Sequence, residues 1–427
     1  MHWFSAALWL AAATVTASSA AAESPQDKTS SSGKPSFHGE LIFPLDHLHN
    51  HGSCVVEMPG GGLFACWYRG SGERGADDVA VMGSRLPRGA KKWDEMFVLS
   101  DTPGFPDTNP CIWVDPFKRL WLFHSTILDN QWESAITRVK ISSHFQKSGS
   151  MPVWDRSDLI LFKPGPEFLQ GVERDLERVW SPVLPLLPPD KAQKLTALLA
   201  DVKKKAANKL ATRLGWMTRA HPTLITTQAG KQRLLVPLYS DGFDFSLVAY
   251  TDDWGATWSC SAPIIGQSNV QPSILQRKDH TLIAFFRDNG PPPQRIMQSE
   301  SVDEGKTWTV AHDIVLPDPG AGLEAIILKS GRWVMINNDT ENARHSLALS
   351  VSEDEGRTWI FKKHVEQAED KPGYGTFAYP SIIQAHDGKI HATYTFTPGK
   401  SGLPGESIKH VEFNEAWLMA SEGRIPL

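Results

Sequence analysis

The chain has few cysteines, no strong charge imbalance and, beyond its first residues, no long apolar run. Four cysteines in 427 residues do not form a disulfide framework, and no Cys/His spacing matches a zinc site, so we predict no metal and no cofactor. A net charge of −5 gives no reason to expect nucleic-acid binding. Because no later segment is long and apolar enough to cross a bilayer, we predict no membrane span after signal removal.

The first residues have the pattern of an export signal. Residues 3–15 form a short apolar run, and a small-x-small site follows at Ala20-Ala21-Ala22. We therefore expect a signal peptide over 1–22, a secreted or periplasmic protein, and a disordered spacer rich in Ser, Lys and Gly over 23–37. His2 but no Lys or Arg precedes the apolar run, which leaves a membrane anchor or an unusual cytosolic N-terminus as alternatives.

One short pattern occurs three times at a nearly constant spacing. It is Ser/Thr-x-Asp-x-Gly-x-x-Trp, and its glycines at 255, 305 and 356 are 50 and 51 residues apart. The Ser or Thr and Asp side chains can bind turn amides, Gly supplies the positive φ of a hairpin, and Trp packs the turn onto its sheet. A repeat of about 50 residues with such a turn predicts a four-stranded propeller blade.

The same unit can be traced six times between residues 38 and 427. First strands begin near residues 52, 109, 221, 271, 323 and 379, and a second apolar run follows each of them. The first two blades have degenerate turns that end at Trp93 and Trp154, and the sixth has none. We predict an all-β, six-bladed β-propeller. Cys54 and Cys66 then fall on neighbouring strands, where a disulfide could form, whereas buried free thiols are expected at Cys111 and Cys260.

Residues 165–215 break the repeat between blades two and three. Pro-rich stretches come first, and an apolar periodicity of three and four residues between Lys191 and Leu214 then predicts a helix. Its apolar face would be formed by Leu195, Leu198, Val202, Ala206 and Leu210. This helical insertion could pack on the propeller as a decoration, or it could form a lid or a subsite wall.

Propeller topology collects polar residues on one face. The start of strand one, the end of strand two and the loop after it share a face, and the repeated turns lie on the other. First-strand starts supply Asn50, His51, Asn109, His221, Gln271, Glu324 and Tyr379. Second-strand ends and the following loops supply Arg69, Glu73, Asp77, Asp78, His124, Asp241, Arg287, Asp288, Arg295, Asn338, Glu341 and Arg344. Arginines from several blades predict a pocket for an anionic sugar, because guanidinium pairs with carboxylate in a bidentate manner.

The region from about 50 to 415 resembles the sialidase (neuraminidase)-like Asp-box, or BNR-repeat, propellers and looks like a divergent member. Ala378-Tyr379-Pro380-Ser381 is similar to the segment that carries the Tyr nucleophile of that family. The segment around Arg344 resembles the one whose Arg grips the substrate carboxylate. Arg287 or Arg295 would match the Arg one blade earlier.

The first blade carries part of the same resemblance. Residues 63–69 are similar to a family segment that ends in a substrate-side Arg, here Arg69. The acid/base carboxylate that follows it in sialidases would be Glu73, Asp77 or Asp78. The resemblance therefore implies Glu73 or Asp77 as general acid/base.

Two positions depart from the family pattern. Blade one opens with Asn50-His51-Gly52-Ser53 instead of Arg-Ile-Pro, and the Glu that activates the Tyr is replaced by Gln271. Because Gln cannot act as a base, Glu324 at the opening of blade five is the nearest replacement by position. The resemblance then implies Tyr379 as nucleophile with Glu324 assisting it.

The function implied by the resemblance is a secreted, exo-acting glycoside hydrolase that releases sialic acid or a related acidic sugar from a glycan or oligosaccharide substrate. Its substrate-binding residues would be Arg69, Arg287, Arg344, His51, Gln271 and Asn109. One alternative is a polysaccharide lyase for uronate-containing glycans, with proton-abstracting candidates His51, His124, His221 and Tyr379. A non-catalytic glycan-binding propeller, in which Gln271 marks lost chemistry, is the other.

Overall fold

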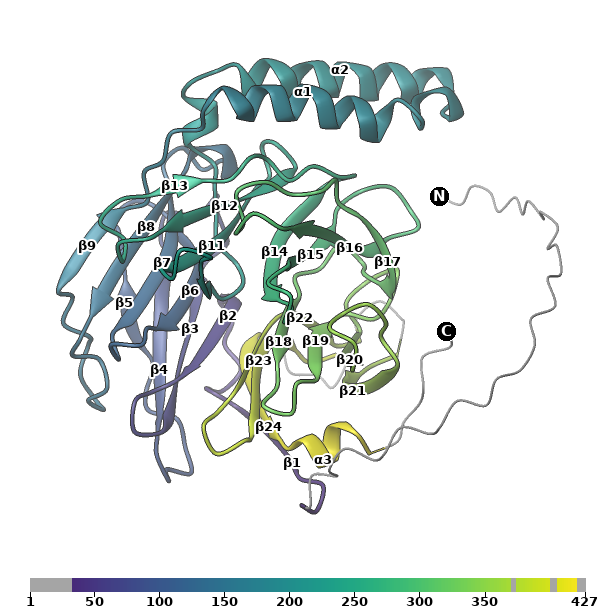
Figure 1. The fold of residues 1–427 in the computed structure, drawn as a ribbon. Helices are drawn as coiled ribbons and strands as arrows, with labels where there is room; N and C mark the ends of the chain where they lie inside the picture. The colour runs from purple at the N-terminus through teal and green to yellow at the C-terminus, as the bar shows by residue number, and fades with distance from the viewer. Residues whose placement is uncertain (1–32, 370–373, 400–404, 421–427) are drawn as a thin grey trace, which may run out of the picture.

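The computed structural model describes residues 33–369, 374–399 and 405–420. It contains six antiparallel four-stranded sheets arranged around a central axis, with a pair of helices outside them (Figure 1). The predicted all-β, six-bladed propeller is therefore confirmed. Blade one has β2 (His49–Glu57), β3 (Gly62–Gly70), β4 (Ala80–Pro87) and β5 (Phe97–Ser100). Blade two has β6 (Asp107–Val114), β7 (Leu120–Ile127), β8 (Ala135–Ser142) and β9 (Arg156–Leu159).

The other four blades follow in chain order. Blade three has β10 (Thr223–Thr226), β11 (Gln232–Ser240), β12 (Phe245–Thr251) and β13 (Ser259–Cys260). Blade four has β14 (Asn269–Gln276), β15 (Leu282–Asp288), β16 (Arg295–Ser301) and β17 (His312–Pro317). Blade five has β18 (Glu324–Ile327), β19 (Trp333–Asn337), β20 (Ser346–Ser352) and β21 (Phe361–Gln367). Blade six has β22 (Thr376–Gln384), β23 (Ile390–Thr397), β24 (Ser407–Phe413) and β1 (Phe37–Leu41).

The first strand of the chain closes the ring. β1 pairs antiparallel with β24, with Phe37 opposite Phe413 and Leu41 opposite Lys409. Both ends of the propeller therefore meet in blade six. The spacer predicted over 23–37 is wrong at Phe37, which belongs to this strand. The predicted signal peptide and residues 23–32 of the spacer lie outside the described residues.

The repeated turns have the predicted mechanics and lie between strands three and four of their blades. In the third copy, Asp354 accepts hydrogen bonds from the Thr358 amide (2.8 Å) and hydroxyl (2.6 Å), and Ser352 Oγ accepts one from the Gly356 amide (2.9 Å). Glu355 and Gly356 have φ of 62° and 79°, so the turn has two consecutive residues in the left-handed region, where glycine is favoured.

We expect Asp354→Ala to destabilise the fold without changing chemistry at the opposite face. The change removes the acceptor of three turn hydrogen bonds, from the Thr358 amide and hydroxyl and from the Ser352 hydroxyl, which should cost about 1–3 kcal/mol of unfolding free energy. Denaturant unfolding monitored by tryptophan fluorescence measures the difference. Glu173→Ala on the exposed side of the insertion is the control, and equal unfolding free energies for the two variants would contradict the role assigned to Asp354.

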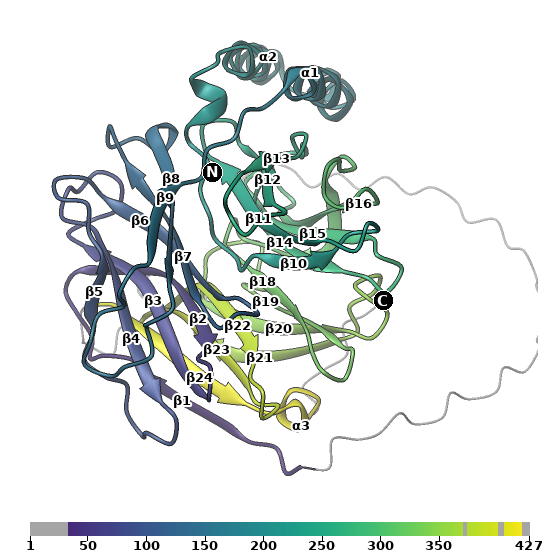
Figure 2. The same cartoon turned by 60° about the vertical axis from the view of Figure 1, so that its left-hand side comes forward.

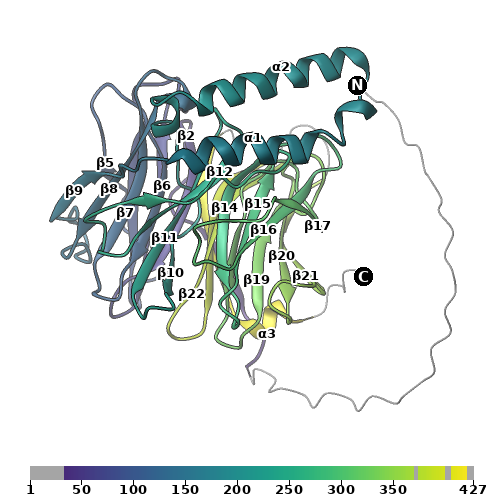
Figure 3. The same ribbon diagram turned by 45° about the horizontal axis from the view of Figure 1, so that its top comes forward.

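The insertion between β9 and β10 is a helical hairpin rather than one helix. α1 (Pro166–Trp180) and α2 (Pro189–Ala206) lie side by side, joined by η2 (Leu184–Leu186), and η3 (Ala211–Arg213) leads back to the sheets (Figures 1 and 3). Figure 2 shows the hairpin nearly end-on and outside the blades. None of the helices in the described ranges is long and apolar enough to span a membrane.

Three details of the predicted insertion are wrong. The Pro-rich stretch forms α1, and α2 ends at Ala206 instead of reaching residue 214. Leu198 and Leu210 of the predicted apolar face are exposed by 55% and 66%. The hairpin instead packs through Phe168, whose ring lies 5.7 Å from that of Phe243 in the β11–β12 loop. It is therefore anchored on blade three.

Candidate active site

A polar cavity of about 420 Å³ opens on the face where the first strands begin. It is lined by His51, Tyr68, Glu73, Asn109, Trp132, Tyr239, Asp241, Gln271, Arg287, Arg344 and Tyr379. Of the ten residues we predicted for the site, seven line this cavity: Tyr379, Glu73, Arg287, Arg344, His51, Gln271 and Asn109. Propeller topology therefore brings together residues more than 300 positions apart.

A repeated backbone irregularity aims these side chains at the axis. The pairing register of the first strand shifts at the same place in blades one, two, four and six. The residue inside each shift has a positive φ: 66° at Gly52, 50° at Asn109, 56° at Gln271 and 51° at Tyr379. A positive φ is uncommon for residues other than glycine, and its recurrence on one face is typical of a built site.

Tyr379 is at the centre of the cavity. Its hydroxyl accepts hydrogen bonds from Arg287 Nη1 (2.8 Å) and Gln271 Nε2 (3.1 Å). Burial alone would raise the pKa of Tyr379, but the charges of Arg287 and Arg344 and the hydrogen bond from Gln271 together lower it below the ordinary value. The site thus favours the phenolate more than water does, although no carboxylate bonds to this hydroxyl among the described residues.

Cationic and aromatic groups surround the Tyr379 ring. The guanidinium carbons of Arg344 and Arg219 lie 5.3 and 5.1 Å from its centroid, and the His51 ring centroid is 4.2 Å away. Arg219 also donates to the Pro380 carbonyl (2.6 Å), which holds the strand that carries Tyr379. Burial, followed by the charge of His49, lowers the pKa of His51 well below its ordinary value, so His51 is a neutral imidazole.

The two carboxyl groups of the cavity have opposite proton affinities. A hydrogen bond from His49 is the largest influence on Glu73 and, with that from Tyr68 (2.8 Å), lowers its pKa to about 2. Asp241 is reached by solvent inside the concave site, yet the protein around it reduces its hydration and raises its pKa to about 6. Asp241 is therefore the better proton donor near neutral pH, and Glu73 is an ionised carboxylate.

Three predicted site residues lie outside the cavity. Arg69 donates to Asp46 (2.5 Å), and Asp77 is exposed and accepts a hydrogen bond from Asn130 (2.9 Å). Glu324 is buried and accepts hydrogen bonds from the Ile382 amide (2.9 Å) and from His221. Within the described chain no hydrogen bond joins Glu324 to Tyr379. The prediction that Glu324 assists Tyr379 directly is therefore wrong.

The register explains the error at Glu324. Glu324 lies opposite Ile336 in its blade, at the level that Ser381 occupies opposite Thr393 in blade six. It is therefore below Tyr379 and not beside it. Two other candidates are displaced as well, because His221 bonds to the buried Glu324 and His124 is buried against Ser100 of blade one. Of the two arginines predicted from blade four, Arg295 pairs with Glu341 (2.5 Å) and Arg287 lines the cavity.

Several pocket residues were not predicted from the sequence. Tyr68 and Tyr239 are buried at the ends of second strands, where the alternation of apolar residues marks them only as core. Trp132 comes from the β7–β8 loop, one of the loops that we expected on this face. Arg219, which contacts the Tyr379 ring but does not line the cavity, was also not predicted. It precedes β10, where the inserted hairpin interrupts the repeat.

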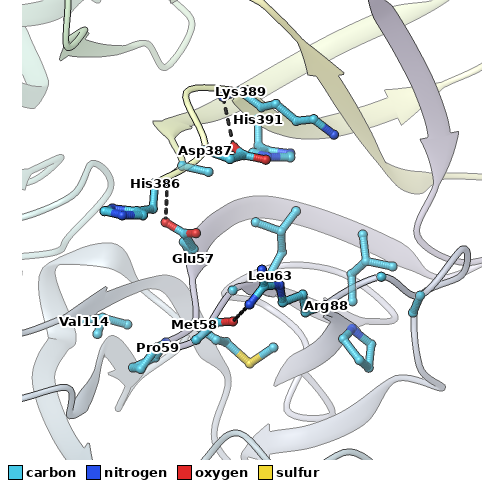
Figure 4. A pocket seen from close by; sticks show the side chains of 18 of the residues that line it. Glu57, Met58, Pro59, Leu63, Arg88, Val114, His386, Asp387, Lys389 and His391 are labelled. Atoms are coloured by element: carbon cyan, nitrogen blue, oxygen red, sulfur yellow. Dashed lines mark hydrogen bonds between the residues drawn. The ribbon is translucent and has the colours of Figure 1, made fainter.

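A larger hollow of about 680 Å³ lies on the opposite face, between the β2–β3 and β22–β23 hairpins (Figure 4). There Glu57 accepts a hydrogen bond from the His386 amide (2.7 Å), and Asp387 accepts one from Lys389. The first contact joins blade one to blade six and the second closes the β22–β23 turn, and no tyrosine contributes to the lining. The smaller cavity around Tyr379 therefore remains the candidate active site.

The sequence matches the family described as "BNR repeat-like domain" over residues 61–151 and 204–392. The interruption coincides with the helical hairpin. Among curated proteins, the anhydrosialidase of Macrobdella decora is 27% identical over 191 residues, which are 40% of this chain and 24% of that protein. The match thus spans about a quarter of that relative.

Similar solved structures share the propeller. They include a leech intramolecular trans-sialidase complexed with 2,7-anhydro-Neu5Ac (12% identity, TM-score 0.62, 89% of this chain and 71% of that chain). A Hadza microbial sialidase has 16% identity and a TM-score of 0.57 over 88% of this chain and 68% of its own. The GH93 α-L-arabinofuranosidase of Fusarium graminearum has 15% identity and a TM-score of 0.53 over 88% and 98%. These likenesses show a common fold, and the matched sequence shows that the chain belongs to the BNR repeat-like domain family.

Proposed function

We propose that this chain is an exported, exo-acting glycoside hydrolase that releases sialic acid or a related acidic sugar. The observation that carries the proposal is the bonding of the Tyr379 hydroxyl to Arg287 (2.8 Å), with Arg344 over the same ring. The cavity of about 420 Å³ is of a size for a terminal sugar unit. The sialidases and the arabinofuranosidase that share the fold also act on glycans, as their names state.

The chemistry starts with Tyr379. Its oxygen forms a bond to the anomeric carbon while the bond to the glycosidic oxygen breaks, and Asp241 donates its proton to that oxygen. A substrate carboxylate held by Arg287 and Arg344 would repel a carboxylate nucleophile, whereas a phenol avoids this repulsion. Water, deprotonated by the ionised Asp241, then hydrolyses the glycosyl–tyrosine bond and returns the proton to the enzyme.

Activation of Tyr379 relies on positive charge. Gln271 occupies the position beside the hydroxyl and donates a hydrogen bond but cannot accept the phenolic proton. Arg287 and Arg344 lower the pKa of Tyr379 against the effect of burial. The ionised Glu73, which accepts a hydrogen bond from Tyr68 (2.8 Å), is the carboxylate of the cavity available to receive that proton through water.

The neutral imidazole of His51 favours a second candidate function, eliminative cleavage of a uronate glycan. Its ring lies 4.2 Å from that of Tyr379, and Thr395 Oγ1 lies 3.0 Å from its Nδ1. His51 and Tyr379 together can remove the proton from the carbon next to a substrate carboxylate whose charge is neutralised by an arginine. His124 and His221 do not contribute to this site, which leaves His51 and Tyr379 for the reaction.

A substrate screen separates these functions. Purified protein is incubated with sialylated oligosaccharides and with uronate-containing polysaccharides, and the products are identified by chromatography and mass spectrometry. Release of a free acidic sugar supports the hydrolase. Ultraviolet absorbance from an unsaturated uronate product would contradict the hydrolase and support the lyase. Tight binding of sialosides without any product would contradict both enzymatic functions.

A further inference from the structure

One level below the cavity, five of the six first strands contribute a ring of small or polar side chains to the channel. The pairing register places Cys54, Cys111, Ser273, Glu324 and Ser381 at one level of their blades. His221, just before β10, bonds to members of this ring. The ring belongs neither to the substrate cavity nor to the proposed glycosidase chemistry.

His221 connects two members of the ring, Glu324 and Cys54, in a chain of hydrogen bonds. Glu324 Oε1 lies 2.7 Å from His221 Nδ1, and His221 Nε2 lies between the Val55 carbonyl oxygen (3.0 Å) and Cys54 Sγ (3.2 Å). Glu324 also binds the His221 amide (2.7 Å), which fixes the imidazole from two sides. This is the order of groups that activates a thiol: a carboxylate orients an imidazole, and the imidazole takes or gives the proton of the sulfur.

A second thiol lies within reach of the first. The Sγ atoms of Cys54 and Cys111 are 3.9 Å apart, on the first strands of adjacent blades. Cys111 Sγ also donates to the Ala220 carbonyl (3.3 Å), next to His221. All four cysteines of the chain are free thiols in the structure, so this pair is in its reduced form.

We propose that Cys54 and Cys111 form a peroxide-reactive dithiol that closes to a disulfide, with His221 and Glu324 as its proton relay. The Cys54 thiolate attacks one oxygen of hydrogen peroxide, the O–O bond breaks, and the departing hydroxide takes a proton from His221 to leave as water. The Cys111 sulfur, losing its proton to His221, then attacks the sulfenic acid at Cys54. The S–O bond breaks and a second water leaves, so that two thiols are oxidised and one peroxide is reduced.

Electrostatics supports Cys54 as the attacking thiol. Burial alone would raise the pKa of the Cys54 thiol, but hydrogen bonds with Cys111 and Cys66 and the charge of His221 together lower it well below its ordinary value. Burial and the hydrogen bond with Cys54 raise the pKa of Cys111, as expected for the resolving thiol. The pKa of Cys260 in blade three is raised to about 12 by burial, so it should react last.

A cavity on the face opposite the substrate cavity reaches the proposed relay. It has a volume of about 590 Å³, and its lining includes His221, Glu324, Val56 and Trp113. Cys54 and Cys111 do not line it and are 1% and 0% exposed. Because both thiols are buried behind His221, we name a small oxidant, hydrogen peroxide, rather than a bulky disulfide.

The test is to oxidise the purified full chain and map its thiols. Protein is treated with hydrogen peroxide, quenched with N-ethylmaleimide under denaturing conditions, digested and analysed by mass spectrometry. We expect a reductant-sensitive peptide pair that joins Cys54 to Cys111, formed before Cys260 is oxidised. A Cys54–Cys66 linkage, whose partners lie opposite each other in β2 and β3, or first oxidation at Cys260, would overturn the proposal.

Variants test the relay. His221→Gln should slow disulfide formation by about tenfold or more, because the imidazolium no longer favours the thiolate. Cys111→Ser should stop at a sulfenic acid on Cys54, and Cys260→Ser should behave as wild type. Oxidation of His221→Gln at the wild-type rate would remove the relay from the proposal. These readouts do not depend on glycosidase activity and stand apart from the test of the proposed function.

Discussion

Tyr379→Phe is expected to reduce turnover by roughly 10³-fold or more, because it removes the nucleophilic oxygen and nothing else of the ring. The phenyl ring can keep its contacts with His51 (4.2 Å between centroids) and with the guanidiniums of Arg344 and Arg219. Arg287 and Gln271 lose their common acceptor but stay beside the sugar. The loss of turnover should therefore appear in kcat, measured with the best sialoside substrate found in the screen. Isothermal titration calorimetry should show that the variant still binds the sugar.

Tyr250→Phe is the matched control for this variant. Tyr250 in β12 undergoes the same chemical change but packs against Arg233 (4.4 Å) away from the cavity, so wild-type turnover is expected. Purified Tyr379→Phe with wild-type kcat would exclude Tyr379 as the nucleophile. If uronate cleavage alone were lost in Tyr379→Phe, the tyrosine would serve the eliminative reaction instead.

Asp241→Asn is expected to lower the rate by roughly 10²–10⁴-fold on natural glycosides, because their leaving groups need a proton. The pKa of Asp241 is raised to about 6, mainly by desolvation. The carboxyl group is protonated below this pH and loses its proton as the pH rises. The wild-type rate should therefore fall as the pH increases through about 6, and this descending limb should disappear in Asp241→Asn. Aryl glycosides with good leaving groups should be affected less.

Glu73→Gln and Asp77→Asn separate the three acidic residues. Glu73, with a pKa of about 2, is ionised throughout the pH range of the assay, so its loss should lower the rate without removing the limb near pH 6. Asp77 lies outside the cavity and bonds to Asn130, so Asp77→Asn should keep wild-type activity. A pH limb that vanishes in Glu73→Gln and survives in Asp241→Asn would transfer the acid role to Glu73.

The fold was predictable from the sequence wherever its signal is local. Each repeated turn contains its own Asp, Gly and Trp, so its spacing predicts blades without knowledge of distant contacts. β1 has no such signal, because Phe37 acquires its partner Phe413 from the other end of the chain. Helix α1 was missed for a related reason. Pro166 occupies a first helical position, where proline is tolerated, but a Pro-rich stretch resembles a loop when its packing is unknown.

The sequence predicted which face of the propeller holds the candidate site, but not how far along the axis each side chain lies. Tyr379 and Gln271 were placed correctly because the start of a first strand must lie at the axis. A register error of two residues moves a side chain to another level of the blade: Glu324 corresponds to Ser381, two residues after Tyr379. Arg69 was misassigned because its partner Asp46 precedes the blade and is not part of the repeat.

By itself the sequence determined the number of blades, the position of the insertion and the face that holds Tyr379, because these follow from repeated local chemistry. Only the tertiary structure decided which groups meet. The positive φ at Gln271 and Tyr379, the desolvation of Asp241 and the contact between Cys54 and Cys111 each depend on neighbours from other blades. Proton affinities and contacts between strands are properties of the assembled channel, and no single repeat contains them.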